Sequence, residues 1–340
     1  MNIGESEFPL IEPSRRKPLD AWLNALFWAI ALCTLLISCW AHRLAGFTFP
    51  NPWNDEPWML WGAIFFLQHN TPFSDFINLE RPVFAFPAYG TALGLLFKAT
   101  GVSFSLARWT SWVGTMLAYL ALLRIVRRHP FPRIAAGTVS LFFLGSAAVI
   151  AGNMVRPEAV VLMLAAVSFS LLTDRKDWKG LALSACCGIF HIAGLFFFLA
   201  AFGTVVARAL RLHRFPPRPR LTDWLFIAAI ATLILLHGAV ILTHWDVYLL
   251  DTLTNVQVDN PSNAVGRLLF SPMTPWYAMA AGLALFFFWR NPDHLPWIAF
   301  GGACLLIPAF RLQMWYDIYR QMGLMMMTLT IPLLAWEIST

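Results

Sequence analysis

Two adjacent carboxylates, Asp55 and Glu56, precede a proline in an otherwise apolar part of the chain. Pro57 has a backbone torsion that suits the first turn of a helix, and carboxylates are favoured there because the helix dipole is positive at that end. Such a pair could accept a proton from a hydroxyl group or hold a divalent cation. The alternative is a helix cap with one solvated charge.

Two further motifs combine an arginine, a glutamate and a proline. They are Glu80-Arg81-Pro82 and Arg156-Pro157-Glu158. An arginine can bind a phosphate through two parallel hydrogen bonds, so Arg81 is a candidate phosphate ligand. The charges of Arg156-Pro157-Glu158 lie near the membrane in a tight turn, which makes them functional candidates. The alternatives are an interfacial salt bridge at Arg81 and a tight turn with a snorkelling side chain at Arg156.

His191 stands alone between Phe190 and Ile192. A histidine in such apolar surroundings is more often a hydrogen-bonded core residue than a ligand. Aromatic and basic residues at 311–320 fit either a membrane-interface belt or the rim of a phosphate-lipid groove. The sequence has no P-loop, no HExxH zinc motif, no GxSxG elbow and no histidine spacing typical of a metal site.

The composition is that of a membrane protein. The 340 residues are 59% hydrophobic and 12% charged, whereas globular proteins have about 25% charged residues. A soluble fold cannot bury that much apolar surface. We therefore expect an all-α polytopic membrane protein, which excludes a nucleic-acid-binding domain, a secreted disulfide scaffold and a Rossmann enzyme.

Ten apolar segments are candidates for membrane-spanning helices, which need about 20 apolar residues, or fewer where a helix is short or broken. They are 21–40, 105–123, 134–152, 159–173, 180–190, 192–207, 224–243, 275–289, 295–310 and 322–336. With the N-terminus inside, 16 of the 24 lysine and arginine residues lie in cytoplasmic segments. This asymmetry predicts about ten spans in the inner (plasma) membrane, with both termini cytoplasmic.

The first outer loop, 41–104, is the longest stretch between two spans. Residues 83–100 in this loop are apolar but contain Pro87 and Gly90. Counting them as a span would reverse the side of every later basic loop. We therefore expect a helix lying on the outer membrane face, and a second such juxtamembrane helix at 57–69.

We interpret the chain as a single membrane domain, 1–340. Its parts are a cytoplasmic tail at 1–20, the outer loop at 41–104, core spans with the Arg-Pro-Glu turn at 105–210, and C-terminal spans at 211–340. A secondary transporter would be expected to show inverted repeats and charges at the membrane midplane. Here no internal repeat is evident, and the charges gather at the outer boundary.

These motifs, in this order and topology, resemble the GT-C glycosyltransferases, in particular the branch of the lipid A aminoarabinose transferases and the dolichyl-phosphate-mannose protein mannosyltransferases. The matching segments are Asp55-Glu56, 79–83, 95–102 with Ala107-Arg108, and 155–159. The match covers about residues 20–210. Where the family has Thr-Lys-Gly in the hairpin between spans 5 and 6, this chain has Phe190-His191-Ile192. Many relatives also carry further spans or a soluble outer domain.

The resemblance implies an inverting hexosyl- or pentosyltransferase. It would move a sugar from a polyprenyl-phosphate donor to a lipid, glycan or protein acceptor on the outer (periplasmic) face. Asp55 and Glu56 would form its catalytic acidic motif, with Asp55 as general base. Arg81, Arg156 and His191 would bind the donor phosphate.

The resemblance leaves the cofactor and two other classes of protein open. A divalent metal ion is a candidate cofactor, with Glu158 and Glu80 as candidate ligands, although Glu80 could instead orient Arg81. Membrane lipids are further expected partners, and nucleic acid is not. The alternatives are a non-catalytic subunit that binds or assembles lipid-linked sugars and a secondary transporter.

Overall fold

The computed structural model describes residues 13–44, 56–70, 87–145, 148–149, 152–213, 216–243, 245–246, 249, 271–310 and 317–339. Within these ranges the protein is all-helical and contains no strand, which confirms the predicted all-α class. Four helical stretches there are long and apolar enough to cross a membrane. They are Phe104–Val126, Gly194–Leu212, Leu221–Thr243 and Ile318–Ser339.

Each apolar segment that the sequence marks as a span coincides with one helix. These helices are α1 (Pro13–Leu44), α4 (Phe104–Val126), α5 (Pro132–Leu144), α7 (Pro157–Thr173), α8 (Asp177–Phe190), α9 (Gly194–Leu212), α10 (Leu221–Thr243), α13 (Thr274–Arg290), α14 (Leu295–Phe310) and α15 (Asp317–Ser339). The two helices expected in the first loop are α2 (Glu56–His69) and α3 (Pro87–Thr100). A short 3-10 turn, η1 (Pro292–His294), joins α13 to α14.

Local sequence explains where several helices begin and end. Ser103 caps α4, because its hydroxyl oxygen accepts a hydrogen bond from the Leu106 N–H at 3.3 Å. Gly101 separates α3 from α4 with a φ of +86°, a conformation that side chains disfavour. The helix predicted over 134–152 is shorter in the structure, because Gly145 leaves the helical conformation with ψ 161°.

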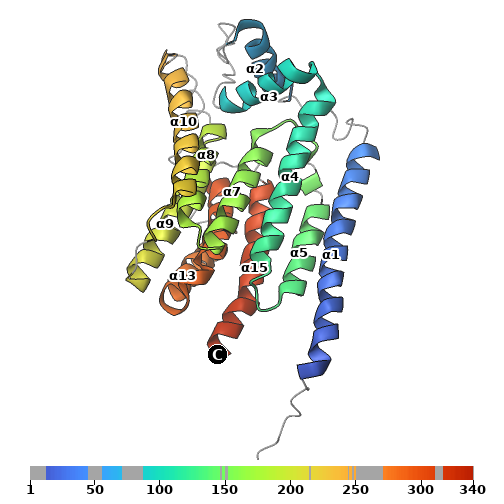
Figure 1. The fold of residues 1–340 in the computed structure, drawn as a ribbon, viewed down its shortest axis with the longest axis vertical. Helices are drawn as coiled ribbons and strands as arrows, with labels where there is room; N and C mark the ends of the chain where they lie inside the picture. Colours follow the sequence, from blue (N-terminus) through green and yellow to red (C-terminus); the bar gives the residue numbers. More distant parts are fainter. Residues whose placement is uncertain are drawn as a thin grey trace, which may run out of the picture.

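The helices form one bundle around a continuous apolar core (Figure 1). Helix α7 lies centrally and packs against α4, α8, α9 and α14. Helices α14 and α15 pack together, α1 lies beside α5, and α10 packs against α8. The aromatic centre of this core includes Phe169, Phe197 and Phe300, all fully buried. The bundle therefore provides a rigid frame for the side chains at its two ends.

Helices α2 and α3 pack against each other and lie across one end of the bundle (Figure 1). Their close approach depends on glycine. A Cβ at Gly94 would lie 2.9 Å from the Ala63 carbonyl oxygen, closer than such contacts normally come. A small apolar core that includes Ala63, Phe97, Ala107 and Val155 joins this layer to α4 and to the chain segment before α7. The layer is thus packed onto the bundle end.

The two ends of the bundle carry different side chains. One end, which we name the Glu56 end, holds the starts of α2, α4 and α7 and the break between α8 and α9. The other, which we name the Arg208 end, holds the ends of α4, α7 and α9 and the connection between α13 and α14. Most of the charged contacts among the described residues belong to one of these two groups.

Candidate functional site

A fully buried ion pair lies at the Glu56 end. Glu56, the first residue of α2, accepts two hydrogen bonds from Arg108 of α4: Nε to Oε1 at 3.0 Å and Nη2 to Oε2 at 2.6 Å. Both side chains are 0% exposed. Oε1 also accepts the backbone N–H of Val155 at 2.8 Å, and the guanidinium lies 4.7 Å from the centre of the Phe104 ring. Both oxygens of the carboxylate are therefore engaged by the protein.

This pair joins three segments that are distant in sequence. Glu56 belongs to the first loop, Arg108 to α4 and Val155 to the turn before α7. A charged bidentate contact in a dry site has strict geometry. The start of α2 is consequently fixed against the turn at 153–158.

The predicted Arg-Pro-Glu motif forms a second ion pair in that turn. Arg156 directs Nη2 to Oε1 of Glu158 at 2.9 Å and Nε to Oε2 at 3.2 Å. Glu158 is in the first turn of α7, where the helix dipole favours a carboxylate. Its side chain is 5% exposed and that of Arg156 is 13% exposed. Glu158 thereby fixes the direction of the guanidinium, which lies at the edge of the buried region.

The turn at 153–158 is held by residues from three more helices. Tyr319 of α15 donates its hydroxyl to the Glu158 carbonyl oxygen at 3.2 Å. The Arg156 N–H points to the Ser111 hydroxyl of α4 at 3.5 Å. His42 of α1 contacts the Asn153 side chain. With Glu56, these contacts make the turn the meeting point of α1, α2, α4, α7 and α15.

Tyr89 of α3 brings a phenol into the same region. Its side chain is buried beside Thr110 and Ser111, and the charges of Glu158 and Glu56 act on it. Burial, with a smaller contribution from these carboxylates, raises the pKa of Tyr89 to about 12. The phenol therefore stays protonated at physiological pH and cannot act as a base there.

His191 separates α8 from α9 and is buried. Its Nδ1 accepts the Ala193 N–H at 2.9 Å, so the ring stabilises the break between the two helices. His191 also interacts electrostatically with Glu158. It therefore has the hydrogen-bonded core role considered from the sequence, in a place beside the Arg-Pro-Glu turn.

The structure brings together four of the residues singled out from the sequence: Glu56, Arg156, Glu158 and His191. Val155 binds Glu56 and Arg156 pairs with Glu158. Because Val155 and Arg156 are consecutive, the two ion pairs are adjacent. Asp55, Glu80 and Arg81 lie outside the described residues, and their roles stay predictions. We name the described group, with Arg108 and Tyr89, the Glu56 cluster.

Sequence reasoning did not identify Arg108 and Tyr89 as members of a site. A signal for Arg108 was available, because an arginine within the apolar run of α4 needs a partner. Nothing local points to Glu56 as that partner, since 52 residues separate the two. Tyr89 carries no comparable signal among the other aromatic residues of α3.

The predicted metal site is not tested by these residues. In the described part of the chain no group of three His, Cys, Asp or Glu side chains could hold a metal ion. Glu158 directs both oxygens to Arg156, so a metal there would have to displace that arginine. Glu80, the other candidate ligand, is not among the described residues.

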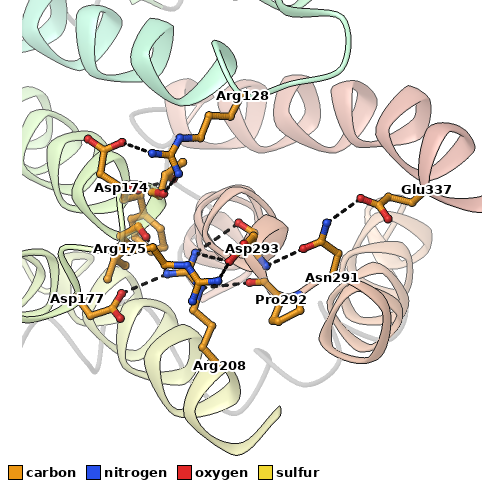
Figure 2. Close-up of polar contacts among 12 residues, drawn as sticks. Arg128, Asp174, Arg175, Asp177, Arg208, Asn291, Pro292, Asp293 and Glu337 are labelled. Atoms are coloured by element: carbon orange, nitrogen blue, oxygen red, sulfur yellow. Dashed lines mark hydrogen bonds and ion pairs between the residues drawn. The ribbon is translucent and has the colours of Figure 1, made fainter. Parts of the chain in front are cut away.

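A second polar group, which we name the Arg208 network, fills the other end of the bundle (Figure 2). Arg208 of α9 is 3% exposed and donates to Asp177 Oδ1 at 3.2 Å. It also donates to the carbonyl oxygens of Leu172 at 2.7 Å and Pro292 at 3.2 Å. A cation is favoured at the C-terminal end of α7, where carbonyls lack helical partners.

The remainder of the Arg208 network ties together other helix ends (Figure 2). Arg124 of α4 and Arg128, two residues beyond the end of α4, both pair with Asp174 at the end of α7. Glu337 of α15 accepts the side-chain N–H of Asn291 at 2.9 Å. Burial raises the pKa of Asp177, against the opposing effect of Arg208. This pattern of contacts stabilises helix ends.

Comparison of the sequence with protein-family models and with curated proteins gives no match in either case. The Glu56 cluster is therefore interpreted from its own geometry. It combines two carboxylates, one at the start of α2 and one at the start of α7, each paired with an arginine, with a protonated phenol at the end of an apolar helix bundle.

Proposed function

We propose that this chain is an integral membrane glycosyltransferase that transfers a hexose or pentose from a polyprenyl-phosphate donor to a lipid, glycan or protein acceptor. The observation that supports this most strongly is the contact of Glu56 with Arg108 and the Val155 N–H. Glu56 directly follows Asp55 in the sequence, and Val155 directly precedes Arg156. A candidate base and a candidate phosphate ligand, about a hundred residues apart in sequence, thus belong to neighbouring segments.

The proposal includes a membrane topology. All ten helices that match the apolar segments span the inner membrane, with both termini cytoplasmic. The Glu56 end faces outward and the Arg208 end faces the cytoplasm. One observation supports this orientation: the basic residues Arg124, Arg128 and Arg290 lie at the Arg208 end. Basic residues favour the cytoplasmic side.

In the proposed reaction Asp55 is the general base. Its carboxylate takes the proton of the acceptor hydroxyl, and the hydroxyl oxygen forms a bond to the anomeric carbon of the sugar. The bond between that carbon and the phosphate oxygen breaks with its electrons on the phosphate. The transition state has oxocarbenium character, and attack opposite to the leaving group inverts the configuration.

Two arginines stabilise the leaving polyprenyl phosphate in this scheme. Arg81 and Arg156 offer guanidinium groups that can fork onto phosphate oxygens. Glu158 is a positioning residue for Arg156, because it holds Nε and Nη2 through two contacts. Glu56 is likewise a positioning residue, since both of its oxygens point into the protein.

The test is turnover by the purified protein. The protein in neutral detergent receives a polyprenyl-phosphate sugar together with a membrane extract as the source of acceptor, and mass spectrometry follows bound donor, released polyprenyl phosphate and glycosylated acceptor. We expect binding and release, with weaker donor binding in Arg156→Lys, which loses the fork, and unchanged binding in the control Arg133→Lys. Binding without release would favour the non-catalytic lipid-linked-sugar subunit, and absence of both would reject the proposal.

A further inference from the structure

A shallow apolar groove lies on an exposed face of α13, toward the Arg208 end. It has a volume of about 480 Å³ and is lined by Gly282, Leu285, Phe286, Trp289 and Arg290. This spacing follows one face of a helix. Nothing lies within 4 Å of the position where a Cβ on Gly282 would be, so the glycine leaves an open notch. Leu285 and Trp289 are both more than 60% exposed.

Two arginines lie where the groove ends. Arg211 of α9 donates Nε and Nη2 to the Trp289 carbonyl oxygen at 3.2 and 3.1 Å, and its guanidinium lies 5.9 Å from the Trp289 ring. Arg290 donates to the Glu337 carbonyl oxygen at 3.2 Å and remains half exposed. Carbonyl acceptors orient these guanidinium groups without cancelling their charge.

The nearest carboxylate does not neutralise this pair of arginines. Glu337 approaches Arg290 only to 4.0 Å. One of its oxygens also lies within 3.0 Å of both the Asn291 side-chain nitrogen and His294 Nε2. The groove therefore leads from apolar side chains to an exposed tryptophan and a net positive charge.

We propose that this groove binds one anionic phospholipid of the cytoplasmic leaflet. The acyl chain lies along Gly282 and Leu285, the Trp289 ring lies at the level of the headgroup, and Arg211 and Arg290 bind the phosphate. Tryptophan is enriched at the membrane interface, and arginines there attract anionic lipids. The site is separate from the proposed transferase site, and its assignment to the cytoplasmic leaflet rests on the proposed membrane topology.

Charge complementarity selects this occupant over simpler ones. A free phosphate would use the arginines but would leave the apolar groove uncovered. A zwitterionic lipid would fill the groove but would carry no net charge for the arginines to attract. An anionic phospholipid satisfies both parts, because it joins an apolar acyl chain to a charged headgroup.

The proposal is tested by lipid retention. The full-length protein in neutral detergent receives equal amounts of phosphatidylglycerol and phosphatidylcholine, and native mass spectrometry measures the fraction that retains each lipid. We expect the wild type to prefer phosphatidylglycerol. The double variant Arg211→Gln and Arg290→Gln should lose about fivefold in phosphatidylglycerol affinity for each arginine removed. Phosphatidylcholine retention should not change.

Two further variants separate the groove from general surface charge. Arg218→Gln with Arg220→Gln removes the same charge from exposed residues that line no groove, so it should retain phosphatidylglycerol like the wild type. Gly282→Leu has open space at its Cβ position and fills the notch, so it should weaken retention while unfolding stays normal. Equal retention of both lipids by the wild type would overturn the proposal. So would undiminished phosphatidylglycerol retention in either groove variant, or an equal loss in the control.

Discussion

The two ends of the bundle both pair arginines with carboxylates, but the surroundings of the pairs differ. At the Glu56 end, Glu56 and Arg108 are completely buried and bind each other through two hydrogen bonds. At the Arg208 end, Arg128 pairs with Asp174 while more than half of its side chain is exposed. Arg208 itself is buried there, yet most of its hydrogen bonds go to carbonyl oxygens at helix ends.

Arginine–carboxylate pairs therefore have two different structural roles in this protein. At the Glu56 end carboxylates lie at the starts of helices, and at the Arg208 end arginines lie at the ends of helices. The helix dipole favours both placements. A buried pair costs desolvation energy and is maintained only by strict geometry. The Glu56 end uses that geometry to fix the start of α2 against the turn at 153–158, whereas the Arg208 end joins helices.

The largest expected effect comes from breaking the buried pair. Arg108→Met leaves the Glu56 carboxylate buried without its cation, which should lower the free energy of unfolding by about 3–5 kcal/mol. Hydrogen exchange should increase most in α2, because its start loses the anchor. Unfolding in mixed micelles and exchange mass spectrometry measure the two quantities.

A matched double variant makes this prediction specific. Glu56→Gln combined with Arg108→Met removes both charges, so it should be destabilised less than the sum of the single variants. Additive losses would mean that the two side chains do not depend on each other. An Arg108→Met protein within about 1 kcal/mol of the wild type would contradict the anchor, because partner removal from a buried pair costs more.

A smaller effect is expected at Asp177, and it depends on pH. Burial raises the pKa of this carboxyl in the folded protein, so the folded state holds the proton more tightly than the unfolded chain does. The contribution of Asp177 to stability should therefore be greatest below the ordinary pKa and should fall as pH rises through the raised one. In Asp177→Asn this dependence should vanish from the unfolding free energy. If the free energy of unfolding of the wild type instead rises relative to that of the variant as pH increases through this interval, burial does not raise the pKa of Asp177.

The smallest effect is expected at the exposed pairs. Arg128→Gln should change the free energy of unfolding by about 0–1 kcal/mol, because solvent screens the ion pair with Asp174. The difference from wild type should shrink further at high salt. Arg218→Gln, an exposed substitution on the same side of the molecule, is the control. A loss comparable to that of Arg108→Met would remove the contrast between the two ends.

Hydropathy predicted the helices because each one carries its own apolar run. Their ends were harder to predict, since they depend on single residues. Gly145 ends α5 eight residues before the predicted boundary at 152, and His191 separates α8 from α9. The sequence of α2 and α3 gave no hydropathic signal for how that pair packs, which depends on the close approach of Gly94 to Ala63.

The candidate site was less accessible to sequence reasoning than the fold. Motif chemistry identified Glu56, Arg156 and Glu158, but the sequence assigned Glu56 to catalysis together with Asp55. The structure directs the Glu56 carboxylate to Arg108 and Val155, a partnership across about a hundred residues that no local pattern encodes. Asp55 lies outside the described residues, so its role as the general base stays a prediction.

The most direct test of the account is the sugar-transfer rate of two neighbouring variants. Asp55→Asn keeps the shape and most of the capping ability but loses the proton acceptor, so transfer should fall by about two to four orders of magnitude. Donor binding and unfolding should match the wild type. Glu56→Gln should instead lower the free energy of unfolding and reduce transfer much less in the protein that remains folded. Unimpaired transfer by Asp55→Asn would contradict the central claim that Asp55 is the base.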